Sequence, residues 1–157
     1  MKKIGIIGIG NPLRKDDGIG ILLLEQLRKQ KKEFPRGIMY VDGGTGGMNL
    51  LHLLARFQVV FIIDAVDFKA QPGETRIFTL DEIKSQKLPV RLSTHEADFL
   101  KILNLSKELN ELPYELFIFA IQPKDVSHGT TLSKEIESRT DSIYKKLVQE
   151  IQSRTIL

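Results

Sequence analysis

The 157-residue sequence predicts a single α/β domain over residues 1–157. The expected architecture is a three-layer sandwich, in which a mostly parallel, five-stranded twisted sheet carries helices on both faces. Two observations support this prediction. Short apolar runs alternate along the chain with segments of helical periodicity. The interior runs are continuously apolar, as expected of strands that are buried on both faces.

Five apolar runs are expected to form the strands of this sheet. The strongest is VVFIIDAV at 59–66, which is rich in β-branched residues and apolar on both sides. ETRIFTL at 74–80 follows a Gln-Pro-Gly turn and alternates in the manner of an edge strand. The remaining predicted strands cover residues 3–9, 38–41 and 114–123.

Four segments between and after the strands have helical signals. The first helix is expected at 18–28, with Asp16 or Asp17 as its N-cap. Ser93 and Glu96 have the spacing of a capping box, which predicts that another helix begins at Ser93. The other two helices are expected at 50–57 and at 133–154, where an apolar stripe marks the buried face of the last one.

Composition and charge exclude several classes of protein. The chain is 41% apolar and 27% charged, has a net charge of +3 and contains no cysteine. This charge is too small to indicate a nucleic-acid partner, and the densest basic run, RKQKKEFPR at 28–36, is expected to be the solvated end of the first helix. Without cysteine there is no disulfide, thiolate metal site or cysteine nucleophile. No segment is long and apolar enough to cross a membrane, so we expect a cytoplasmic protein, and we expect it to be a monomer.

The loop GIGNPLRKDDGIG, at 8–20, is similar to a dinucleotide-binding turn but departs from it. Gly8 and Gly10 fit the pattern G-x-G-x-x-G, whereas Leu13 occupies the position of the third glycine. Pro12 removes a backbone donor, and two acids at the entrance of the helix would repel a pyrophosphate. The loop is therefore expected to hold a cation rather than an anion, and a nucleotide-binding module is the weaker alternative.

A possible metal site follows from the polar residues near the strand ends. Asp64 lies in the apolar run FIIDAV, where an ionised, unpaired carboxylate is costly and needs a cation or hydrogen-bond donors. His95 is expected in the first turn of a helix, where the helix dipole favours the neutral, metal-ligating imidazole. Together with Asp17 they could hold a divalent first-row ion such as zinc or nickel.

Each of these residues also has a simpler explanation. Asp17 alone is typical of an acid at a helix start, Asp64 could cap a neighbouring helix, and His95 could be an ordinary surface histidine. The three are far apart in sequence, and no compact metal motif is present. Other polar residues that follow predicted strands are Asp42, Gln122 and Asp125.

Five blocks of sequence change this balance. In order along the chain they are GIGNPLRKDDGIG, DGGTGGMNLL, IIDAVDFKAQPGE, STHEADFLKIL and FAIQPKDV. Their content and spacing resemble those of the [NiFe]-hydrogenase maturation proteases, the endopeptidases that trim the C-terminal extension of a hydrogenase large subunit. The resemblance covers nearly the whole chain.

The resemblance implies a site made of Asp17, Asp64 and His95, which would act both as metal ligands and as the catalytic residues. The family often carries Glu at the position of Asp17, so the shorter side chain changes the expected geometry by one methylene. Asp16 is then expected to be the helix cap. The loop after the second strand is implied to bind the backbone of the substrate, through Asp42, Gly43, Gly44, Thr45 and Gly46.

The implied partner is the nickel-loaded large-subunit precursor of a [NiFe] hydrogenase, cleaved after a cysteine-containing motif near its C-terminus. Nickel would be supplied by this substrate, with another divalent metal at the same site as the alternative. The attacking water could be activated by the metal or by Asp17 or Asp64 as a general base. A non-catalytic metal-binding protein or maturation chaperone of the same fold is the alternative function.

Overall fold

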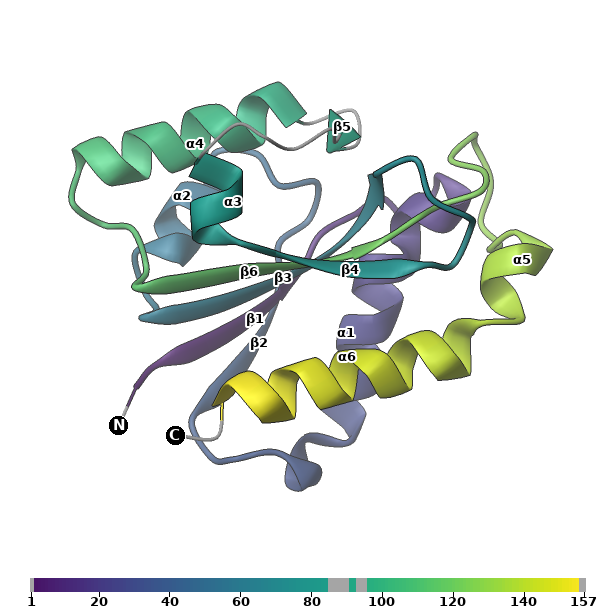
Figure 1. Ribbon diagram of the computed structural model, residues 1–157, viewed down its shortest axis with the longest axis horizontal. Helices are drawn as coiled ribbons and strands as arrows, with labels where there is room; N and C mark the ends of the chain where they lie inside the picture. The colour runs from purple at the N-terminus through teal and green to yellow at the C-terminus, as the bar shows by residue number, and fades with distance from the viewer. Residues whose placement is uncertain (1, 85–90, 93–95, 156–157) are drawn as a thin grey trace.

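The structure, a computed structural model, describes residues 2–84, 91–92 and 96–155. Its strands are Ile4–Gly8 (β1), Ile38–Asp42 (β2), Val59–Asp67 (β3), Thr75–Thr79 (β4), Arg91–Leu92 (β5) and Glu115–Ile121 (β6). Five of them form a twisted sheet with the order β2-β1-β3-β6-β4, and the short β5 pairs antiparallel with β3 outside this order (Figure 1). β2, β1, β3 and β6 are parallel, and β4 pairs antiparallel with β6 at one edge. The predicted mostly parallel, five-stranded sheet is therefore confirmed.

The helices cover both faces of this sheet. They are Ile19–Lys29 (α1), Asn49–Leu54 (α2), Leu80–Lys84 (α3), Glu96–Glu108 (α4), Lys134–Glu137 (α5) and Thr140–Thr155 (α6), with 3-10 turns at Lys15–Gly18 (η1) and Lys31–Glu33 (η2). α1 and α6 lie on one face, and α2 and α4 lie on the other (Figure 1). No described helix is long and apolar enough to span a bilayer.

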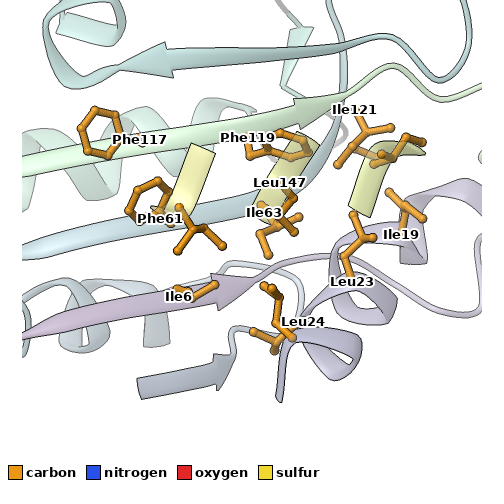
Figure 2. Packing of buried hydrophobic residues seen from close by; sticks show 14 of the residues in the cluster. Ile6, Ile19, Leu23, Leu24, Phe61, Ile63, Phe117, Phe119, Ile121 and Leu147 are labelled. Atoms are coloured by element: carbon orange, nitrogen blue, oxygen red, sulfur yellow. The ribbon is translucent and has the colours of Figure 1, made fainter. Parts of the chain in front are cut away.

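Two buried clusters, one on each face, hold the layers together. On the α1/α6 face, Leu23 and Leu24 of α1 and Leu147 of α6 pack against Phe61 and Phe119 of the strands (Figure 2). Large apolar side chains on alternate positions of β3 serve the two clusters in turn, which is the pattern of a strand buried on both sides. Burial of this apolar surface is the main force that fixes the sheet and thereby the ends of its strands.

Three local predictions need correction. α1 begins at Ile19 with Gly18 as its N-cap and without a side-chain cap, so neither Asp16 nor Asp17 is the cap. The last helix does begin after Ser133, whose hydroxyl caps α5, but it is interrupted before α6 begins at Thr140. The elements α3 and β5 were not expected from the sequence. The helix start predicted at Ser93 lies outside the described residues.

Gly20 lets α1 lie directly on the sheet, and its replacement by alanine is expected to be destabilising. A Cβ at this position would lie 2.4 Å from the backbone oxygens of both Ile9 and Ile63, which cannot move aside as a side chain would. Overpacking costs about 1–3 kcal/mol or more and exceeds the gain of about 1 kcal/mol from replacing a helical glycine. We expect Gly20→Ala to lower the thermal midpoint by about 4 °C or more.

The matched control for this variant is Gly47→Ala, because a Cβ at Gly47 would meet no heavy atom within 4 Å. It should melt within about 1 °C of the wild type in the same calorimetric scan. An equal melting temperature for both variants would contradict the close approach of α1 to the sheet.

Candidate functional site

Asp64 lies near the carboxyl end of β3, in the same alternating register as Ile62 and Val66 of the α2/α4 face. Its side chain is buried, and its Oδ1 has no hydrogen-bond partner among the residues that the structure describes. Burial raises the pKa of Asp64 well above its ordinary value, and the negative charge of Asp17 raises it further against an opposing hydrogen bond from the Ala65 N–H. This oxygen is therefore a place for a proton or a cation.

Asp17 supplies a second carboxylate to the same place. It lies in η1, which packs against β3, and its side chain is buried. Its Oδ2 accepts a hydrogen bond from the backbone N–H of Asn11 (2.9 Å). The effect of Asp17 on the pKa of Asp64 follows from the proximity of the two carboxylates. The fold thus brings together two of the three side chains that the sequence singled out.

Asp16, the neighbour of Asp17, has a structural role that the sequence did not reveal. Its Oδ2 accepts hydrogen bonds from the backbone N–H groups of Lys124 and Asp125 (both 2.9 Å) and from the hydroxyl of Ser133 (2.8 Å). Its Oδ1 accepts a fourth hydrogen bond from the Ser133 N–H (2.8 Å). The side chain is fully buried, so it ties the opening loop to the segment that joins β6 to α5.

Further contacts join the same two segments. The Lys15 N–H donates to the Gly129 carbonyl (3.0 Å), and the Gly129 N–H donates to the Leu13 carbonyl (2.9 Å). The ammonium of Lys15 pairs with Asp125 at 2.9 Å. Hydrogen bonds from Ser127, together with Lys15, hold the pKa of Asp125 well below its ordinary range. Asp125 is therefore an anchored anion and a poor candidate for a general base.

His95 lies outside the described residues, together with Ser93 and Thr94. The described chain on either side of it includes Leu92 of β5, which pairs with Val66 two residues beyond Asp64, and Glu96, the first residue of α4. Within the described part of the chain, no three His, Asp or Glu side chains form a group that could hold a metal. The three-residue metal site consequently stays a prediction that depends on His95.

The loop after β2 lies beside the opening loop. Gly10 donates its N–H to the carbonyl of Gly44 (2.9 Å), which joins the two loops. Asp42 uses its Oδ1 to accept the Gly44 N–H (2.8 Å), so its carboxylate shapes the turn. Gly44 and Gly46 have φ angles of +57° and +79°, and Thr45 between them is exposed. The predicted binding of substrate backbone by this loop is compatible with its exposure and stays a prediction.

Gln122 fixes the chain that leaves β3 just after Asp64. Its Oε1 accepts hydrogen bonds from the N–H groups of Phe68 (2.8 Å) and Ala70 (3.2 Å). Its Nε2 donates to Oδ1 of Asp67 (3.1 Å). The sequence indicates Gln122 only as a polar residue at a strand end, because its hydrogen-bond partners lie in a distant part of the chain. In the structure it is buried, and its hydrogen bonds hold the segment that follows β3 in place.

The chain is similar to known proteins both in sequence and in fold. The family model for hydrogenase maturation protease matches residues 21–150, a range that includes Asp64 and His95 but begins after Asp17. The hydrogenase expression/formation protein HoxM of Azotobacter vinelandii is 28% identical over 153 residues, which are 97% of this chain and 73% of that protein. HupM of Azotobacter chroococcum is 30% identical over 137 residues, which are 87% of this chain and 65% of that protein.

The fold has a close counterpart among solved structures. The hydrogenase maturating endopeptidase HybD from Escherichia coli aligns with a TM-score of 0.81 and covers 98% of this chain and 94% of that chain. At 23% sequence identity, this likeness shows a shared fold. The two Azotobacter relatives are longer, and this chain spans about two thirds to three quarters of their length.

Proposed function

Because the chain belongs to the hydrogenase maturation protease family, we propose that it is an endopeptidase that acts on a [NiFe]-hydrogenase large-subunit precursor. In this proposal it removes the C-terminal extension once nickel has been inserted. The proposed place of cleavage is the cytoplasm. Nickel is part of the substrate, and Asp17, Asp64 and His95 recognise it.

The observation that carries the proposal is the Oδ1 of Asp64, which has no hydrogen-bond partner among the described residues and lies beside the carboxylate of Asp17. Without a cation, burial and like charge favour a proton on Asp64. A nickel ion carried by the precursor would displace this proton and satisfy both carboxylates. Metal recognition would then be coupled to docking, because the ion that satisfies the acid pair arrives with the precursor.

The rim of the site supports a protein substrate. Leu13 in the opening loop is 63% exposed, and Met48 at the end of the loop after β2 is 60% exposed. Exposed apolar side chains on these two loops, which the hydrogen bond from Gly10 to Gly44 joins, suit contact with another protein surface. The glycine-rich backbone between them leaves room for an extended segment of the precursor.

The attacking water has two possible activators in this arrangement. The nickel ion could lower the pKa of the water and polarise the scissile carbonyl. Alternatively, a carboxylate oxygen of Asp17 or Asp64 that does not contact the ion could take the proton as a general base. Both routes place the reaction at the acid pair, so both require Asp64.

The deciding experiment incubates the protein with nickel-loaded and nickel-free precursor in parallel and reads the mass of the large subunit. We expect the extension to be lost from the nickel-loaded precursor alone. Cleavage of both forms would contradict nickel recognition. Cleavage of neither, with a stable complex on a native gel, would favour the maturation chaperone of the same fold.

A further inference from the structure

A basic groove lies at the end of the sheet opposite to the acid pair. It has a volume of about 780 Å³ and lies between the C-terminal end of α1, the turn η2 and the beginning of β2. Four cationic side chains line it, from Arg28, Lys31, Lys32 and Arg36. The segment from α1 to β2 is at the bottom of the view in Figure 1, away from the opening loop. The basic run at 28–36 is therefore part of a concave site rather than only the solvated end of a helix.

Most of these charges are available for a ligand. Lys31, Lys32 and Arg36 are exposed, and none of them forms an ion pair with another described residue. Arg28 is held in place, because it pairs with Glu25 (2.8 Å) and donates to the carbonyl of Tyr40 (3.0 Å). The groove thus combines the guanidinium of Arg28, which is held in place, with three exposed cationic side chains that can reorient towards a ligand.

Tyr40 also lines the groove, and its backbone carbonyl accepts the hydrogen bond that holds Arg28 there. Its hydroxyl is buried and has no hydrogen-bond partner in the described part of the chain. Burial raises the pKa of Tyr40, so the phenol keeps its proton and remains a hydrogen-bond donor. Because this hydroxyl is closed off from solvent, the groove offers a ligand its four cations, which suit a molecule that brings several acceptor oxygens.

We propose that this groove binds an acidic segment of the large-subunit precursor, remote from the bond that is cleaved. The identity of this partner rests on the proposed function. Carboxylate side chains spaced along a peptide match cations spread over a groove of this size, which is much larger than one phosphate group. Nucleic acid is disfavoured because Phe34 in the groove is only 6% exposed and offers no face for stacking a base.

The position of the groove determines what it can affect. The parallel strand β1 separates the two ends of the sheet, and its five residues span roughly 17 Å. Charges that far from the acid pair are largely screened from it at physiological salt. The groove should therefore change the affinity for the precursor and leave the chemical step unchanged.

The first test measures binding without cleavage. The probe is fluorescein-labelled octaglutamate, followed by fluorescence anisotropy at low ionic strength, with octaglutamine as the neutral comparison. We expect octaglutamate to bind and Lys31→Glu/Lys32→Glu to weaken its binding about tenfold. The matched control, Lys145→Glu/Lys146→Glu, makes the same charge change at exposed positions of α6 and should alter binding less than twofold.

Several outcomes would overturn the proposal. These are equal binding of octaglutamine, an equal loss of binding in the two double variants, or stronger displacement of the probe by pyrophosphate or a DNA oligonucleotide than by unlabelled octaglutamate. In the processing assay, Lys31→Glu/Lys32→Glu should raise KM about tenfold at unchanged kcat. A fall in kcat at unchanged KM in this double variant would also contradict the proposed binding of an acidic segment in the groove. Failure of wild-type protein to cleave any precursor would instead count against the proposed function, because the anisotropy result does not depend on cleavage.

Discussion

Asp64→Asn is expected to reduce processing of the nickel-loaded precursor at least about 100-fold and, at the same time, to raise the thermal midpoint at pH 7. Asparagine has nearly the same shape but cannot carry the negative charge that would bind nickel. It also removes the cost of burying a carboxylate beside Asp17 when one of its oxygens has no hydrogen-bond partner in the part of the chain that the structure describes. Each kcal/mol gained should raise the midpoint by about 2–4 °C.

The gain in stability should depend on pH in a defined direction. Because the pKa of Asp64 is raised in the folded state, the unfolded chain releases this proton at a lower pH than the folded protein does. Wild-type stability therefore falls as the pH rises above the ordinary aspartate pKa of about 3.9, until the folded protein also ionises. The difference between Asp64→Asn and wild type should be small near pH 3 and larger at pH 7, in parallel calorimetric scans.

Asp141→Asn is the matched control, because it removes the same charge from an exposed position in the first turn of α6. It should process the precursor at the wild-type rate and melt slightly lower, since an acid stabilises a helix N-terminus. Normal processing by Asp64→Asn would exclude Asp64 from the site. A melting temperature below that of the wild type would show that its carboxylate is stabilised by a partner outside the described residues.

Asp16→Ala is expected to lower the free energy of unfolding by about 3 kcal/mol or more. The substitution leaves three backbone N–H groups and the Ser133 hydroxyl without their shared acceptor, in a place where the carboxylate is fully buried. Hydrogen bonds to a charged acceptor are worth about 1.5–3 kcal/mol each, although their losses do not add fully. Urea unfolding at 25 °C should show this loss as a lower midpoint at an unchanged slope.

The same variant should also process the precursor more slowly, because Asp17 is the next residue in η1 and is positioned by the same turn. Ser133→Ala is the comparison. It removes one of the four hydrogen bonds to Asp16 and the cap of α5, and should cost about 1–2 kcal/mol. An Asp16→Ala variant no less stable than Ser133→Ala would refute the role of this carboxylate in joining the two segments.

The sheet was predictable because its signal is local. A strand buried on both faces must be apolar at nearly every position, and VVFIIDAV shows this within eight residues. The same reasoning identified Asp64, since a carboxylate in such a run is conspicuous for its cost. α3 also has a local signal in the sequence. Thr79 and Glu82 have capping-box spacing, and they do exchange hydrogen bonds at the start of α3.

Other features depend on contacts that no local pattern contains. Asp16 was expected to cap a helix, since acids before a helix usually do so. Its actual donors come from Lys124, Asp125 and Ser133, which are more than 100 residues away in sequence. The Tyr40 hydroxyl, which has no hydrogen-bond partner within the described ranges, is equally invisible in the sequence, because its state depends on which groups the folded chain leaves out of reach.

The long-range bonds of Asp16 have a consequence for protein synthesis. The turn that holds Asp17 is synthesised well before Ser133, which lies 117 residues after Asp16 in the chain. A nascent chain that has not yet reached Ser133 cannot satisfy the Asp16 carboxylate and cannot bury it without penalty. Translation itself thereby delays the hydrogen bonds of Asp16, and with them the positioning of the turn that holds Asp17, until Ser133 has been made.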